Sequence, residues 1–178
     1  MTSFADSCTH EALFGATEDR PDGGEWATPS TFFKELNAEF HFTLDACATA
    51  QNAKCPVFYT KEQDALKQDW PGVVFVNPPY GRHIGDWLAK GRRQASKGST
   101  VVFLVHARTD TRWFHQHVYH VADEIRFIKG RLKFEHKDGM KQSAPFPSMV
   151  VVYKPKTESC TPEGCTCVKT EKENSDPS

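Results

Sequence analysis

The chain has 178 residues, enough for one domain with a hydrophobic core, and its hydrophobic content of 38% is typical of globular proteins. No apolar run reaches the length of a membrane span, and the N-terminus lacks the basic and apolar regions of a secretory signal, so we expect a cytoplasmic protein. The formal net charge is only −1, but residues 26–154 carry 18 Lys and Arg against 12 Asp and Glu, a basic middle that permits a polyanionic partner without requiring one.

Composition divides the chain into three parts. Residues 1–24 are acidic and residues 155–178 are polar, and we expect the first to be flexible and the second to be disordered. Residues 25–154 are expected to form the folded domain. Three cysteines of the tail are arranged as C-x4-C-x-C, which differs from the paired C-x2-C spacing of structural zinc sites, so we expect no metal.

The middle part alternates between expected helices and strands. A helix is expected to begin at Thr28-Pro29, with Thr28 as the N-cap and Pro29 at the first helical position. Apolar residues then recur at helical spacing, at Phe32, Phe33, Leu36 and Phe40. Further helices are expected over residues 84–96 and after Asp110, which can act as an N-cap. Strands are expected at residues 40–46 (ending at Asp45), 56–59, 72–76, 100–107, 124–128 and 148–154.

This order of elements predicts an α/β fold. Strands that alternate with helices form βαβ units, which build a mainly parallel sheet in a three-layer arrangement. Ligands of such sheets bind beyond the carboxyl ends of the strands. Polar segments follow three of the predicted strands, namely Asp45, Asn77-Pro78-Pro79-Tyr80 and residues 106–108, and we expect them to share one edge of the sheet.

The stretch Asn77-Pro78-Pro79-Tyr80, called the NPPY loop below, carries groups suited to methylating an exocyclic amine of a nucleobase. The N6 lone pair of adenine is delocalised into the ring, and two acceptors placed on its two hydrogens would free that lone pair. Asn77 offers an amide oxygen, and Pro78 offers a carbonyl oxygen whose direction is set by the rigid rings of Pro78 and Pro79. Tyr80 offers a flat face for an extruded base. The alternative is that the prolines only end the strand and that Tyr80 packs on the surface.

At these residues the chain resembles the S-adenosylmethionine-dependent amino-methyltransferases, whose signature is [D/N/S]-P-P-[Y/F/W]. More narrowly, it resembles the small phage and prophage DNA adenine-N6 methyltransferase family, and the resemblance covers nearly all of residues 25–154. The matching stretches are residues 25–29, 42–54, 59–66, 75–81, 107–115, 128–134 and 144–153.

The resemblance implies a class I (Rossmann-like) methyltransferase fold, DNA as substrate and S-adenosylmethionine as cofactor. It makes the NPPY loop catalytic and assigns cofactor binding to Thr28, Pro29, Asp45, Ala46, Cys47, Asp64 and Asn77. The chain departs from the wider superfamily because residues 44–50, "LDACATA", lack the usual glycine-rich F-x-G-x-G turn. This departure leaves Asp45 as the better supported position, and a plain strand-end cap is its alternative role.

DNA contacts are expected from basic residues near the same edge of the sheet. The candidates are Arg108, Arg112, His115, Arg131 and Lys133. An exposed arginine is often only solvated, so each has a plain surface role as its alternative. Trp113 and Phe114 are expected to fill the core. The segment 143–148 is interpreted as a structural turn that can also shape the base pocket.

Two other functions compete with DNA adenine methylation. An NPPY loop also serves enzymes that methylate a glutamine amide of a protein or an amine of RNA. A catalytically silent DNA-binding module is the rival from another class, and the intact NPPY loop argues against it. Transfer of methyl groups to peptide or RNA alone would favour the first rival, and DNA binding without cofactor binding would favour the second.

Overall fold

The computed structural model describes residues 27–135, 141–144 and 146–156, so the predictions for residues 1–24 and for the cysteine tail lie outside the described residues. The elements in chain order are α1 (Ser30–Phe40), β1 (Leu44–Asp45), β2 (Val57–Phe58), β3 (Val73–Val76), α2 (Ile84–Ser96), β4 (Thr100–His106), α3 (Arg112–His117), β5 (Glu124–Phe127), β6 (Lys133–Glu135), β7 (Lys141–Ser143) and β8 (Ser148–Tyr153). None of the helices in this part of the chain is long and apolar enough to cross a membrane.

Six strands form the main sheet, in the order β2-β1-β3-β4-β8-β5. Strands β2, β1, β3 and β4 pair in parallel, as the alternation of strands and helices predicts. Strand β8 inserts between β4 and β5 and runs antiparallel to both of them. The sheet is therefore mixed, and the α/β prediction is confirmed.

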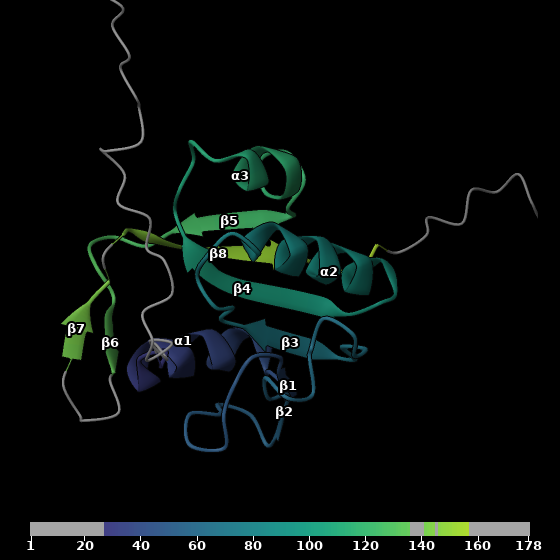
Figure 1. Ribbon diagram of the computed structural model, residues 1–178, viewed down its shortest axis with the longest axis horizontal. Helices are drawn as coiled ribbons and strands as arrows, with labels where there is room; N and C mark the ends of the chain where they lie inside the picture. The colour runs from purple at the N-terminus through teal and green to yellow at the C-terminus, as the bar shows by residue number, and fades with distance from the viewer. Residues whose placement is uncertain (1–26, 136–140, 145, 157–178) are drawn as a thin grey trace, which may run out of the picture.

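Helices cover both faces of the sheet, as Figure 1 shows. Side chains of β4 alternate between the faces: Phe103 lies in the cluster with α2 and α3, whereas Val102 and Leu104 lie in the cluster with α1. Contact between α2 and the sheet is close at Gly91, where an added Cβ would lie 2.3 Å from Cε2 of Phe103. These two cores on opposite faces produce the predicted three layers.

Three predicted boundaries are wrong. Pro29, not Thr28, is the N-cap residue of α1, and the expected strand at residues 40–46 is reduced to Leu44–Asp45. The strand is short because His41 takes a left-handed conformation (φ 56°) and ends the helix there. Asp110 does not cap α3, whose N-cap is Thr111; instead its carboxylate lies 3.5 Å from Arg108.

A two-stranded hairpin, β6–β7, was not predicted from the sequence. Its strands have three residues each, too few to produce a periodic pattern in a polar stretch. Phe134 of β6 is buried (1% exposed) in the cluster beside α1, which attaches the hairpin to the domain. In Figure 1 the hairpin lies on the side of the molecule where β4 and β5 end.

Candidate active site

The carboxyl ends of β1, β3 and β4 form one edge of the sheet, called the C-terminal edge below. Asp45 pairs with Phe75, and Val76 pairs with Phe103, so the three parallel strands have their carboxyl ends at this edge, where β4 extends three residues further, to His106. The NPPY loop follows β3 directly, and His106 is the last residue of β4. The predicted meeting of these segments on one edge is confirmed.

Asp45 is a buried carboxylate at this edge, with 2% of its surface exposed. Its Oδ1 accepts a hydrogen bond from the Cys47 N–H (3.3 Å), and its Oδ2 accepts one from the Lys54 N–H (3.1 Å). Burial nevertheless raises the pKa of Asp45 to about 6, because desolvation of the charge outweighs these hydrogen bonds. The carboxylate therefore holds residues 46–54 in place while it lies desolvated beside the NPPY loop.

The residues after Asp45 pack closely without a glycine-rich turn. Ala46 is fully buried, and its N–H donates to the carbonyl of Phe75 in β3 (2.9 Å). Cys47 is half-buried. Asp64, also predicted to bind the cofactor, lies in the loop after β2 and pairs with Lys67 at 2.9 Å, a hydrogen bond that lowers the pKa of this carboxylate.

Asn77 is joined to the beginning of α1 by a side-chain hydrogen bond. Its Nδ2 donates to Oγ1 of Thr28 at 3.2 Å, although the two residues are 49 positions apart. Thr28 is 3% exposed, and its hydroxyl accepts this bond from the NPPY loop instead of capping the helix, whose N-cap is Pro29. Within that loop Pro78 is buried and Pro79 is exposed. Because Nδ2 donates to Thr28, the other branch of the amide, Oδ1, has a set direction.

Tyr80 does not present both faces of its ring to solvent. The imidazole of His106 stacks on it, with 3.6 Å between ring centroids and 28° between planes, and Phe134 contacts it edge-on at 6.5 Å. Burial raises the pKa of the Tyr80 hydroxyl well above its usual range. The expected flat face therefore exists, but His106 covers one side of it.

The stack continues from His106 toward the surface. The ring of Phe146 lies 5.1 Å from that of His106, and the guanidinium of Arg108 lies over Phe146 at 5.4 Å. Burial, together with the nearby charge of Arg108, lowers the pKa of His106 to about 4. The sequence placed His106 and Arg108 at the C-terminal edge, and it suggested that the segment 143–148 can shape the base pocket, but it did not single out Phe146.

The predicted DNA-contacting residues come from three segments. Arg112 and His115 are exposed on α3, and Lys133 is exposed at the start of β6. Arg131, just before β6, donates from Nη1 to the Ala144 carbonyl (3.4 Å). Half-buried Arg108 leads from β4 toward α3. Of the two aromatic residues expected in the core, Phe114 is buried (5% exposed) and Trp113 is partly buried against the same cluster.

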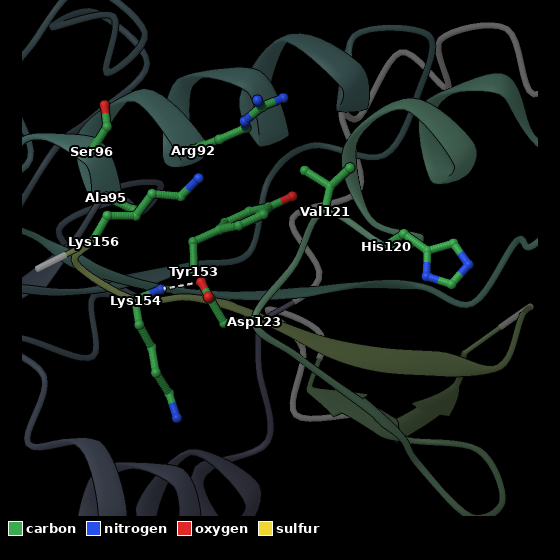
Figure 2. Close-up of a pocket in the computed structure, with 9 residues that line it drawn as sticks. All are labelled: Arg92, Ala95, Ser96, His120, Val121, Asp123, Tyr153, Lys154 and Lys156. Carbon is green, nitrogen blue, oxygen red and sulfur yellow. Dashed lines mark hydrogen bonds between the residues drawn. The ribbon is translucent and has the colours of Figure 1, made fainter. Parts of the chain in front are cut away.

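A hollow of about 160 Å³ lies at the opposite edge of the sheet (Figure 2). Tyr153 lines it and pairs with Val101 near the beginning of β4, whereas the C-terminal edge is at His106. Its volume is below the ~300 Å³ of the smallest typical ligand pockets. The lining residues are Arg92, Ala95, Ser96, His120, Val121, Asp123, Tyr153, Lys154 and Lys156. Within the described ranges, no three His, Cys, Asp or Glu side chains are grouped to hold a metal ion.

Comparisons with a family model and with individual proteins point to the same family. A family model described as DNA N-6-adenine-methyltransferase (Dam) matches residues 15–176. A DNA N-6-adenine-methyltransferase of Haemophilus phage HP1 (strain HP1c1) is 30% identical over 142 residues, which are 77% of this chain and 82% of that protein. The putative methyltransferase YfdM of Escherichia coli (strain K12) is 40% identical over 73 residues, or 36% of this chain and 80% of that protein.

A DNA N-6-adenine-methyltransferase of Escherichia phage T1 is 30% identical over 103 residues, which are 56% of this chain but only 43% of that protein. The family model spans far more than half of the chain, and the HP1 protein is matched over most of its length. The chain therefore belongs to the DNA N-6-adenine-methyltransferase (Dam) family.

Proposed function

We propose that this chain transfers a methyl group from S-adenosylmethionine to N6 of an adenine in double-stranded DNA, with the target base extruded from the helix to the NPPY loop. Membership of the Dam family gives the reaction class, DNA adenine methylation. The observation that carries the placement of the reaction is the NPPY loop at the end of β3, joined to Thr28 and next to the strand that ends at Asp45. We also propose that the six-stranded sheet is that of a class I methyltransferase.

Two oxygens of the NPPY loop would prepare the amine for attack. Oδ1 of Asn77 and the carbonyl oxygen of Pro78 would each accept one N6–H, which draws the nitrogen toward tetrahedral geometry and localises its lone pair. Preorganised dipoles of this kind are worth about 3 kcal/mol each in comparable oxyanion holes. Such a mechanism needs no titrating base, because the nucleophile is neutral and its proton leaves after the methyl group has been transferred.

The residues beside the NPPY loop fit a cationic cofactor. S-adenosylmethionine carries a sulfonium and an ammonium group, and when bound it supplies an electrophilic methyl carbon. Asp45 is a desolvated carboxylate whose raised pKa reflects a lack of sufficient positive charge around it, and a cation beside it would stabilise the ionised form. We propose that the cofactor is held by Asp45 with Ala46, Cys47 and Asp64, and by Thr28, Pro29 and Asn77.

DNA would lie across the C-terminal edge, where the base can reach Tyr80. We propose phosphate or base contacts for Arg108, Arg112, His115, Arg131 and Lys133, because these residues follow β4 or precede and begin the hairpin. A phosphate contact should reveal itself in the salt dependence of binding: replacing Arg112 with Ala would lower the slope of log K against log salt by about one.

The experiment that tests the function uses labelled S-adenosylmethionine and unmodified duplex DNA. Digestion to nucleosides should yield label in N6-methyladenine, and label found only in cytosine would reject the base assignment. Asn77→Ala should abolish turnover yet leave cofactor affinity, measured by calorimetry, largely unchanged, because six of the seven proposed cofactor contacts remain. Equal loss of both quantities would contradict the acceptor role of Asn77.

A further inference from the structure

The stacking of His106 on Tyr80 poses a steric problem for the proposed reaction. Their centroid separation of 3.6 Å is that of two rings in van der Waals contact, so no base fits between them. His106 is 6% exposed and ends β4, next to the NPPY loop. An extruded base that uses this face of Tyr80 must first replace the imidazole.

The polar atoms around the imidazole lack hydrogen-bond partners, as expected for a ligand site and not for a histidine packed permanently in the core. Three buried polar atoms here have no hydrogen-bond partner within the described part of the chain: Nε2 of His106, the hydroxyl of Tyr80 and Oγ of Ser148. Ser148 is 1% exposed and is the cross-strand partner of His106 in the β4–β8 register. Buried groups of this kind are nearly always paired in folded proteins, because leaving them unpaired is costly.

A second aromatic ring, that of Phe146, also contacts the imidazole. Phe146 lies 5.1 Å from it on the way to the surface, and this ring is 36% exposed. The imidazole is thus a flat ring stacked on Tyr80 and in tilted contact (55°) with Phe146, and the place that it occupies is called the slot below. The unpaired hydroxyls belong to Tyr80 itself and to Ser148, the cross-strand partner of His106. Adenine is also a flat ring, and its ring nitrogens accept the hydrogen bonds that hydroxyl groups donate.

We propose that the imidazole of His106 occupies the position of the target nucleobase in the DNA-free protein, and that the extruded adenine displaces it from Tyr80. The inference rests on the proposed function. Because His106 is the last residue of β4, a side-chain rotation at the strand end is enough to vacate the slot. The unpaired hydroxyls of Tyr80 and Ser148 are then available to the incoming base, so entry of adenine offsets the loss of the histidine stack.

The direct test follows the imidazole by NMR. Protein labelled with ¹³C at histidine Cε1 is compared with the His106→Phe variant to assign the His106 signal, which the Tyr80 ring should shift upfield. Saturation with S-adenosylhomocysteine and a duplex containing a site that the wild type methylates should move this signal to the frequency of an unstacked histidine. A signal that stays in place while the duplex binds overturns the proposal.

An energetic test uses steady-state methylation of the same duplex. His106→Ala empties the slot and should lower the KM for DNA about fivefold, the equivalent of one lost aromatic contact, with kcat retained. His106→Phe keeps a ring in the slot and should not lower KM. The control His41→Asn, at an exposed histidine with positive φ, should leave both constants unchanged. An increase in KM for His106→Ala shows that the base stacks on the imidazole and overturns the proposal. Failure of the wild type to methylate any DNA overturns the proposed function, and this inference with it.

Discussion

Replacing Asp45 with Asn should change how the stability of the protein depends on pH. Burial raises the pKa of this carboxyl from 3.8 to about 6 in the folded chain. One pKa unit corresponds to about 1.4 kcal/mol, so ionised Asp45 destabilises the folded protein by roughly 3 kcal/mol near neutral pH. Asn carries no charge and removes this cost.

The sign follows from the raised pKa. Below the unfolded pKa near 4, Asp45 is protonated in both states and the stabilising effect of the raised pKa is fully present; it is lost as the pH rises through about 6. Asn can accept only one of the two hydrogen bonds that Cys47 and Lys54 donate to Asp45, a loss that does not depend on pH. The quantity to measure is therefore the pH dependence of the difference between variant and wild type.

Urea unfolding at a series of pH values measures this difference. The stability of Asp45→Asn minus that of the wild type should rise by about 2 kcal/mol between about pH 4.5 and pH 7.5. Asp64→Asn is the control, because Lys67 lowers the pKa of Asp64 below its ordinary value of 3.8, so its difference should fall with pH only below about pH 4 and stay nearly flat between pH 4.5 and pH 7.5. If the stability difference between Asp45→Asn and the wild type does not change with pH, the claim that burial raises the pKa of this carboxyl is refuted.

Three further predictions concern the NPPY loop, the cofactor and the α2 contact. Thr28→Val removes the acceptor for Nδ2 of Asn77 and should lower kcat about fivefold, the worth of one neutral hydrogen bond, whereas Thr28→Ser should retain activity; a change confined to cofactor affinity would show that Thr28 does not position Asn77. If the carboxylate that ends β1 holds the cofactor, calorimetry should show affinity weakening as the pH falls through about 6, and affinity that does not change across that range would exclude the ion pair. Gly91→Ala drives a Cβ into Phe103 and should destabilise the protein by about 1–3 kcal/mol in urea unfolding, whereas Gly85→Ala in the same helix, with its nearest contact at 3.5 Å, should cost far less.

Much of the fold follows from local pattern. Helix α2 has the predicted bounds of residues 84–96, because its apolar residues recur at helical spacing and are buried against the sheet. The apolar runs at residues 72–76 and 100–107 form β3 and β4, since a strand covered on both faces requires apolar side chains throughout. Parallel pairing of these strands places the NPPY loop and His106 on one edge, as predicted.

Local sequence patterns did not predict the contacts between distant segments of the chain. The sequence pattern predicts that Thr28 caps a helix, yet its hydroxyl accepts a hydrogen bond from Asn77. Only the packing of α1 against the sheet brings these two residues together. The hairpin that carries Phe134 is too short to be periodic, so its ring contact with Tyr80 depends wholly on tertiary structure.

The sequence by itself determined the class of chemistry and the edge of the sheet where we propose that it occurs, because the NPPY loop and the hydrophobic strand before it are both written in consecutive residues. The tertiary structure alone decided what surrounds that loop: the hydroxyl that orients Asn77 and the imidazole that covers Tyr80. These contacts join residues far apart along the chain, and their geometry depends on how strands and helices pack, which no local spacing encodes.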